Sequence, residues 1–247
     1  MQADDLSNLH CVQYVFKTGS TMDDLRLQAK AGAPEWTVIL SETQTSGRGR
    51  RGKTWQSQSG AGLYFSVLLR PNLPSSSLGL LPLLVGSSLA KTIQNIGIPT
   101  LLKWSNDILT PDGRKLCGIL LESEIQNNTV QYIILGIGIN VRRQNFPPEL
   151  NAAALEEFVP IHRRDVLLAI LTNLQLEYQR FLVQPEYALS LWKSQPNTLG
   201  RQVTVLEPNG STWTGTALDL DNSGALQIRT VDSIKTVYAA EISLRHG

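Results

Sequence analysis

The sequence predicts an α+β protein in which helices pack on a mixed or antiparallel sheet, followed by a small antiparallel β-barrel. Three observations predict this class. Short apolar runs typical of buried strands alternate with helical patterns through the first three quarters of the chain. Two of the helical patterns are long and apolar on one side. After Pro196 short alternating strands separated by turns take over, so we expect two domains, residues 1–196 and 197–247.

Four segments have helical character. Ser20 or Thr21 is placed to cap the first, and Pro82 fits the second only near its first turn. The uncharged stretch from Pro71 to Ala90 has the length of a membrane span, but its prolines and serines favour a buried core helix. The predicted helices are Met22–Lys30, Ser77–Asn95, Asp165–Phe181 and Glu186–Ser194.

The strand predictions rest on apolar runs bounded by turn residues. In the first domain the predicted strands are Val12–Lys17, Trp36–Ser41, Leu63–Arg70, Leu101–Trp104, Gly118–Glu122 and Val130–Leu135, with a hairpin turn at Asn127–Asn128. In the second they are Val203–Val205, Trp213–Leu220, Ala225–Val231 and Ile234–Tyr238, with turns at Pro208–Ser211 and Asn222–Gly224.

The composition argues against several classes of protein. Lys and Arg number 22 and Asp and Glu 21, a net charge of +1 that disfavours a broadly basic nucleic-acid-binding protein. Two cysteines and three histidines are too few for a disulfide scaffold or a transition-metal centre. Met1–Asn8 carries two aspartates and no apolar run, unlike a secretory signal. We expect a soluble cytoplasmic protein without membrane attachment.

The densest charge lies in the glycine-rich segment Gly47–Lys53, where four of the 22 basic residues fall within six positions. Charges this close repel one another unless an anion lies among them, and glycines let the backbone N–H groups approach that anion. The segment therefore predicts an anion-binding loop; the alternative is an ordinary solvated surface loop.

The same segment extended to Thr54 matches the P-loop pattern, with Gly47 four residues before Gly52-Lys53-Thr54. A P-loop leaves a strand directly and opens a helix whose N-terminus faces the phosphates. Here six polar residues precede Gly47, and a strand rather than a helix follows. We therefore interpret the match as accidental.

Three other segments carry weaker signals. Lys103–Asp107 places Lys, Asn and Asp at a strand end, where they suit a nucleotide or magnesium ion but also an ordinary turn. In Lys115–Glu122 the alternation of a strand puts Lys115 and Cys117 on one face. Gly136–Asn140 indicates close backbone approach. No histidine has a nucleophile pattern near it, so a Ser/His/Asp triad is not predicted.

Taken in order, these segments resemble the biotin protein ligase family. The matching motifs are Gly19-Ser20-Thr21, Gln44 with Gly47–Trp55, Lys103–Asp107, Lys115–Glu122 and Gly136–Val141. The resemblance implies a class II synthetase-like catalytic domain over residues 1–196 and an SH3-like barrel over 197–247. It implies an ATP-dependent ligase that forms biotinyl-5′-AMP and then transfers biotin to a lysine of the biotin carboxyl carrier domain of acetyl-CoA carboxylase.

The resemblance also implies site residues. Lys115, Arg50 and Asp107 are expected to be catalytic. Biotin is expected to contact Ser20, Thr21, Gln44, Arg48, Gly49, Arg50, Trp55, Lys115 and Gly118. ATP or the adenylate is expected at Arg48, Arg50, Arg51, Lys53, Lys103, Asn106 and Asn140, with Mg²⁺ at Asn106. The arginine loop is expected to close as a lid over the intermediate.

Three positions depart from the family pattern. Met22 replaces an asparagine, Ser105 a proline and Arg142 an asparagine. Met22 is expected to remove one amide contact near biotin, and Ser105 to lose only rigidity. None of the three is expected to touch Lys115 or the arginines.

Some relatives repress transcription through an N-terminal DNA-binding domain. Eighteen residues precede Gly19, too few for such a domain, so a monofunctional ligase without specific DNA binding is expected. A homodimer is possible. The alternatives are a lipoate–protein ligase with the same acyl-adenylate chemistry and, more distantly, a P-loop NTPase or a non-catalytic nucleic-acid-binding module.

Overall fold

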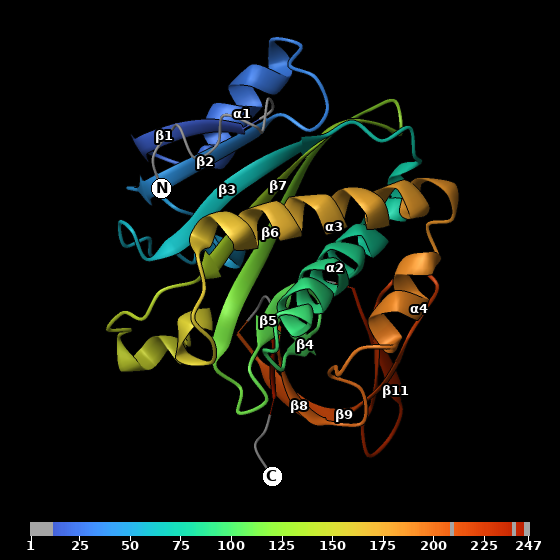
Figure 1. Cartoon of the computed structure of the whole chain (residues 1–247). Coiled ribbons are helices and arrows are strands. Elements are labelled where there is room, and N and C mark those ends of the chain that lie inside the picture. Colours follow the sequence, from blue (N-terminus) through green and yellow to red (C-terminus); the bar gives the residue numbers. More distant parts are fainter. Residues whose placement is uncertain (1–11, 208–209, 239–240, 245–247) are drawn as a thin grey trace.

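A seven-stranded mixed sheet forms the centre of the larger domain (Figure 1). The computed structural model describes residues 12–207, 210–238 and 241–244. The strand order is β1-β2-β3-β7-β6-β5-β4; β1 and β2 are parallel, and the other neighbours are antiparallel. The strands are β1 (Val12–Thr18), β2 (Val38–Gln44), β3 (Gly62–Leu69), β4 (Leu101–Lys103), β5 (Asp107–Leu109), β6 (Lys115–Gln126) and β7 (Thr129–Asn140).

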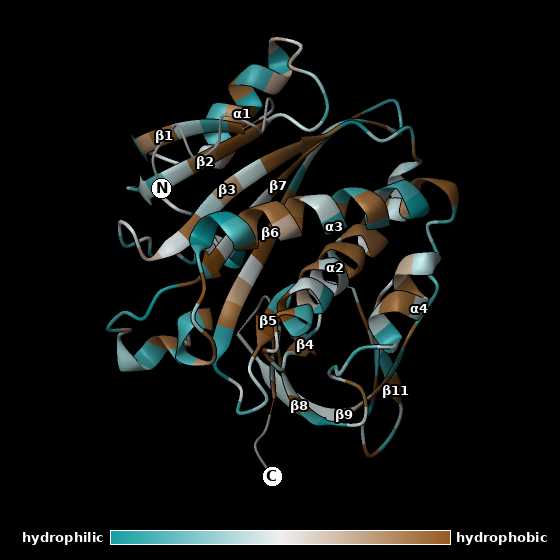
Figure 2. Cartoon of the chain, viewed as in Figure 1, coloured by the Kyte–Doolittle hydropathy of each residue, from teal (hydrophilic) through white to brown (hydrophobic). Residues whose placement is uncertain are grey.

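Helices cover the two faces of this sheet unequally. Three helices lie on one face: α2 (Leu81–Asn95), α3 (Arg163–Val183) and α4 (Tyr187–Lys193). On the other face α1 (Thr21–Lys30) packs on β2, β3 and β7 through Met22, Leu25 and Ala29. The two faces therefore have separate apolar clusters, and the larger one lies beneath α2 and α3 (Figure 2).

Alternation along the strands separates these two faces. In β3, Phe65 and Val67 face the larger core, while Leu68 joins the α1 cluster. In β7, Ile137 and Ile139 are buried in the larger core, and the glycines between them point to the α1 side. The glycines leave the α1 face of β7 open, and the site described below occupies that space.

The segment Ser75–Asn95, a 3₁₀ turn (Ser75–Leu80) followed by α2, is long and apolar enough to span a membrane by length and composition. In this fold 67% of its most apolar window is buried. It packs against α3, α4 and β6, and Pro82 lies in its first turn, as predicted for a core helix.

The second sheet is a five-stranded antiparallel unit with order β11-β10-β9-β8-β12. Its strands are β8 (Gln202–Leu206), β9 (Thr212–Leu220), β10 (Leu226–Arg229), β11 (Ile234–Val237) and β12 (Glu241–Leu244). It is joined to the larger domain by Trp104, whose indole Nε1 donates to the carbonyl of Gly224 at 2.9 Å.

The α+β class with a small C-terminal antiparallel sheet is confirmed, and every predicted helix is present within two residues of its expected bounds at most ends. The strand bounds differ more. β6 and β7 are each 12 residues long, much longer than predicted. β6 starts at Lys115 and runs on through the exposed residues 123–126, and β7 continues through the mostly buried residues 136–140, which pair with β3 and β6. β5 and β12 were not predicted; each is short. Residues 208 and 209 of one predicted turn lie outside the described residues.

Buried ion pairs hold the helices on the sheet. The Arg163 guanidinium at the start of α3 donates to both carboxylate oxygens of Glu42 on β2, at 2.8 and 2.9 Å, and to the carbonyl of Gly62. Burial opposes ionisation of Glu42, but the hydrogen bonds and charge of Arg163 outweigh it, so the pKa of Glu42 is lowered. Because Glu42 also accepts from the N–H of Gly60, this pair fixes the chain entering β3.

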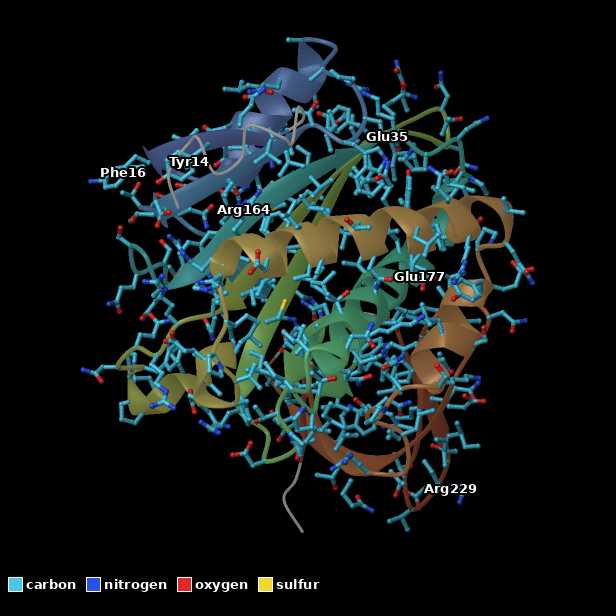
Figure 3. All side chains as sticks on the ribbon, viewed as in Figure 1. Tyr14, Phe16, Glu35, Arg164, Glu177 and Arg229 are labelled. Carbon is cyan, nitrogen blue, oxygen red and sulfur yellow. The ribbon has the colours of Figure 1, made fainter. Side chains whose placement is uncertain are left out.

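Two further carboxylates anchor α3 at its other end (Figure 3). Glu35 accepts a hydrogen bond from the Tyr178 hydroxyl at 2.8 Å. Glu177, fully buried, accepts from Lys91 of α2 at 3.2 Å and from the Tyr187 hydroxyl of α4 at 2.9 Å. The three helices therefore form one layer.

We expect Arg163→Leu to lower the free energy of unfolding by about 3 kcal/mol, because it leaves the buried Glu42 carboxylate without its counter-charge. The double variant Glu42→Leu/Arg163→Leu should recover part of this loss. Urea denaturation of the three proteins measures it. A double variant no more stable than Arg163→Leu would contradict the assignment.

Candidate active site

A cavity of about 610 Å³ opens on the α1 face of the sheet. It is lined by the start of α1, the end of β2, the basic loop, the β4–β5 turn, β6, β7, the segment 144–147 and 149–152, and β12. Every residue that the sequence predicted for the site lines this cavity. The structure thus brings together, around one cavity, motifs that are far apart in the chain.

The inner end of the cavity is polar and buried. The side-chain Oε1 of Gln44 accepts from the backbone N–H of Thr21 at 2.9 Å and from its hydroxyl at 3.2 Å. Ser66, fully buried in β3, lies 2.8 Å from the Thr21 hydroxyl oxygen. Ser20 is at the N-cap position of α1, but its hydroxyl makes no capping bond and is buried without a partner among the described residues. A buried hydroxyl of this kind favours a ligand with polar groups.

The floor of the cavity is made of glycines. Gly118 of β6 and Gly138 of β7 are paired in the sheet, and the Trp55 ring lies against both. A Cβ at Gly118 would lie 2.7 Å from the ring, and one at Gly138 would be closer still, so neither position tolerates a side chain here. Trp55 therefore forms an aromatic wall directly over the strands. The Lys115 Nζ lies 5.4 Å from its ring centroid.

Three charged groups meet at one side of this wall. The Lys115 Nζ is 2.7 Å from Asp107 Oδ1, and the Lys103 Nζ is 3.5 Å from Asp107 Oδ2. Burial would raise the pKa of Asp107, but the positive charges and hydrogen bonds of Lys115 and Lys103 outweigh it and lower the pKa. Asp107 is therefore a carboxylate at neutral pH. Asn140 supports the same corner by donating to the carbonyl of Lys115 at 3.1 Å.

The basic loop, residues 47–55, folds over the cavity and is held by its own arginines. Arg48 bonds Asp23 of α1 at 2.5 Å and Glu122 of β6 at 3.3 Å. Arg50 donates to Asn106 Oδ1 at 2.7 Å, and Arg51 donates to the carbonyl of Leu206 of β8 at 2.9 Å. Each arginine therefore ties the loop to a different part of the molecule. Gly49 and Lys53 close the loop by a backbone bond of 2.6 Å.

The loop is not a P-loop. Arg50–Gly52 form a short 3₁₀ turn, Arg48 and Thr54 form an isolated antiparallel bridge, and the chain then runs irregularly into β3. Because no helix follows Thr54, no helix N-terminus faces the cavity from this segment. The accidental nature of the sequence match is confirmed.

The site departs in one respect from expectation. Ser105 was expected to touch none of the arginines, and this is wrong: the Arg50 Nη1 donates to the Ser105 hydroxyl at 2.9 Å. The β4–β5 turn brings Ser105 next to the loop, which spacing along the chain does not reveal. Met22 lines the cavity, with its sulfur packed against Gly136, while Arg142 is exposed and outside the lining.

The described residues do not fit a metal site built by the protein. No cluster of three or more His, Cys, Asp or Glu side chains occurs among them. The Asn106 oxygen predicted to bind Mg²⁺ accepts from Arg50, and the Asp107 oxygens face two lysines. We therefore derive no step through a protein-bound metal.

Several lining or supporting residues were not predicted. Ser66 carried a usable signal, since it is a polar residue inside an otherwise apolar strand. Asp23 and Glu122, which hold Arg48, looked like an ordinary helix start and strand surface. The contributions of Leu206 and of Ile242–Leu244 from the barrel carried no sequence signal, because they depend on how the two sheets pack.

Comparisons with known proteins agree with this geometry. The biotin/lipoate A/B protein ligase family matches residues 14–140, and the biotin protein ligase C-terminal domain matches residues 198–245. The bifunctional ligase/repressor BirA of Bacillus subtilis (strain 168) is 36% identical over 233 residues, covering 91% of this chain and 71% of that protein. The biotin–[acetyl-CoA-carboxylase] ligase of Mycobacterium tuberculosis is 32% identical over 242 residues, covering 92% and 86%.

A solved structure extends the likeness to three dimensions. The biotin protein ligase from Aquifex aeolicus in complex with biotin and ATP superposes with a TM-score of 0.79 at 30% identity, covering 97% of this chain and all of that one. The fold and the site thus define a protein ligase of the biotin/lipoate type. With both of its parts matched, the chain belongs to the biotin protein ligase family and is a ligase enzyme.

We expect Asp107→Asn to lower the free energy of unfolding by about 1–2 kcal/mol at neutral pH, because it removes the counter-charge of Lys115 and Lys103. The pKa of Asp107 is lowered on folding, so its stabilisation is complete above the unfolded pKa of about 3.9 and is lost as pH falls through the folded value. Urea denaturation across a pH series measures this. If the wild type and Asp107→Asn differed by the same free energy of unfolding at every pH, this expectation would be contradicted.

Proposed function

We propose that this ligase joins biotin to a lysine of a biotin carboxyl carrier domain. Biotin's carboxylate attacks the α-phosphate of ATP to give biotinyl-5′-AMP and pyrophosphate, and the carrier lysine then displaces AMP. One observation carries the proposal: a glycine-floored cavity with a buried polar inner end is covered by a loop of arginines and opens beside Lys115. The complex of the Aquifex aeolicus relative with biotin and ATP supports both substrates.

The inner end of the cavity suits a ureido ring, whose N–H and C=O groups need buried partners. Ser20 brings a hydroxyl that is unpartnered among the described residues, and Thr21 and Gln44 are already oriented by each other and by Ser66. Trp55, Gly49 and Gly118 would then enclose the ring and the apolar tail. The cavity therefore matches a ligand that has an apolar body and one polar edge.

Adenylation must join two anions, so the site has to cancel their repulsion and stabilise the charge that develops on the α-phosphate. Arg48, Arg50 and Lys115 are assigned to the biotin carboxylate and the α-phosphate, and Arg51 and Lys53 to the phosphates of ATP. Lys103, Asn106 and Asn140 lie on the side of the cavity assigned to the nucleotide. Mg²⁺ is assigned to the substrate, as MgATP, since the described residues offer it few ligands.

Transfer requires a neutral amine. The carrier lysine's nitrogen attacks the acyl carbon, the bond from that carbon to the AMP oxygen breaks, and one proton leaves the nitrogen. Asp107, a carboxylate next to Lys115, is assigned to orient the amine and accept this proton. Lys115 then stabilises the negative charge on the departing AMP. The folded arginine loop excludes water, which would otherwise hydrolyse the anhydride.

The carrier of acetyl-CoA carboxylase is the proposed acceptor, a choice supported by the relatives named for that reaction. We place the reaction in the cytoplasm. The experiment is to mix the protein with ATP, Mg²⁺, biotin and a carrier domain and to measure intact mass. A single biotin addition supports the proposal; lipoate-dependent, biotin-independent pyrophosphate exchange would instead make this a lipoate–protein ligase.

We expect Lys115→Ala to reduce biotin-dependent pyrophosphate exchange by at least about 100-fold while leaving the fold intact, because it removes a positive charge from the reacting carboxylate and phosphate. Lys30→Ala, at an exposed position outside the cavity, is the matched control and should exchange at the wild-type rate. Wild-type exchange by Lys115→Ala would remove this residue from the mechanism.

We expect Arg50→Gly to release the adenylate about tenfold to 100-fold faster, because charge-assisted hydrogen bonds that hold both loop and ligand are lost. The released intermediate would biotinylate bystander lysines. Rapid filtration after a single adenylation round, together with avidin blots of added albumin, measures both effects. An unchanged release rate would show that Arg50 does not retain the intermediate.

A further inference from the structure

Ser105, at the tip of the β4–β5 turn, contacts the basic loop (residues 47–55). Its hydroxyl oxygen lies 2.9 Å from the Arg50 Nη1, and the same nitrogen lies 2.7 Å from Asn106 Oδ1. The contact joins residues 55 positions apart in the chain. Ser105 stands where the family motif has a proline, which offers no side-chain acceptor at this position.

We propose that Ser105 is a positioning residue: it holds Arg50 in place over the cavity and thereby keeps the basic loop closed. It touches neither substrate; it acts through Arg50. The expected effect on adenylate retention rests on the proposed function. The expected effect on the position of the loop does not, and it can be measured without substrate.

The turn is a rigid support for such a contact. On one side of Ser105, the Trp104 backbone N–H donates to Thr198 Oγ1 and the indole donates to the carbonyl of Gly224, both at 2.9 Å. On the other side, the Asn106 Nδ2 donates to the carbonyl of Ile119 at 2.5 Å, and the Asn106 carbonyl accepts from the Ile119 N–H. Ser105 is therefore fixed between two residues that are each bonded to another part of the fold.

The middle of the basic loop, by contrast, is exposed. Arg51, Gly52 and Lys53 are exposed, and the 3₁₀ turn Arg50–Gly52 buries no residue. Its backbone is closed mainly onto itself, by bonds such as Gly49 to Lys53 and Trp55 to Gly47. Trp55 holds the end of the loop on Gly118 and Gly138, and the arginine side chains tie its exposed middle to the rest of the fold, so the Arg50 anchor contributes to the restraint of that middle part.

Ser105 gives the Arg50 Nη1 a second acceptor beside Asn106 Oδ1. A guanidinium nitrogen that meets a single amide oxygen can still swing about that contact, whereas two acceptors on adjacent residues fix its direction. Hydrogen bonds from a charged donor are also stronger than neutral ones. Removing the hydroxyl should therefore raise the population of the open loop by about three- to tenfold.

The first experiment uses no substrate. In the full-length protein, Ser105→Ala should raise the rate of limited tryptic cleavage within residues 48–53 by about three- to tenfold, and Ser105→Thr, which keeps the hydroxyl, should restore the wild-type rate. Ser190→Ala, at an exposed serine on α4, is the matched control and should cleave like the wild type. Equal cleavage of Ser105→Ala and the wild type would overturn the proposal.

The second experiment separates action through Arg50 from a general structural effect. After one round of adenylation, Ser105→Ala should release biotinyl-5′-AMP about three- to tenfold faster, and Ser105→Thr should release it at the wild-type rate. In the Arg50→Gly background the same substitution should add nothing. Additive effects on release would overturn the assigned route. Failure of the wild type to exchange pyrophosphate with biotin would overturn the proposed function, while the cleavage experiment would still decide the role of Ser105.

Discussion

The structure depends on one constraint: where β6 and β7 pair at Gly118 and Gly138, the sheet must be densely packed on one face and free of its own side chains on the other. Ile137 and Ile139 alternate with Gly136 and Gly138, so that the aliphatic side chains complete the core beneath α2 and α3. The same alternation leaves a surface on the α1 side where Trp55 can lie directly on the backbone. Core and cavity are thus opposite sides of the same strands, and a shift of register by one residue would destroy both at once.

The positive charges of the site are concentrated in one short loop. The four basic residues of the loop leave 18 basic and 21 acidic residues elsewhere, a net charge of −3 that the total of +1 conceals. Arg48 meets carboxylates of α1 and β6, Arg50 meets neutral acceptors of the β4–β5 turn, and Arg51 meets the barrel. In this arrangement the arginines already have partners within the protein, and bound anions would replace or add to these contacts.

Local patterns in the sequence were enough to predict the helices and to select residues that line one cavity. The stripe of α3, the proline in the first turn of α2 and the ordered motifs all act over a few residues, and the residues they identified do line one cavity. What the sequence could not supply were contacts set by packing between distant elements. Three such features depend on strand order and turn geometry. They are the length of the β6–β7 hairpin, the ion pairs of Arg48 with Asp23 and Glu122, and the hydrogen bond between Arg50 and Ser105. Compared with the proline of the family pattern, Ser105 was expected only to lose rigidity, and its contact with Arg50 was not predicted.

The hydrogen bond from Arg51 to the carbonyl of Leu206 joins residues 155 positions apart, and that from Trp104 to Gly224 joins residues 120 apart. On a ribosome, which adds roughly 5–20 residues per second, the partner of Arg51 is therefore synthesised about 8–30 s after Arg51 itself. During that interval the sheet can form, since its own seven strands lie within residues 12–140. The loop and the β4–β5 turn, however, lack their supports in the barrel. All seven strands of the larger sheet can thus pair before the barrel strands that complete the site are synthesised.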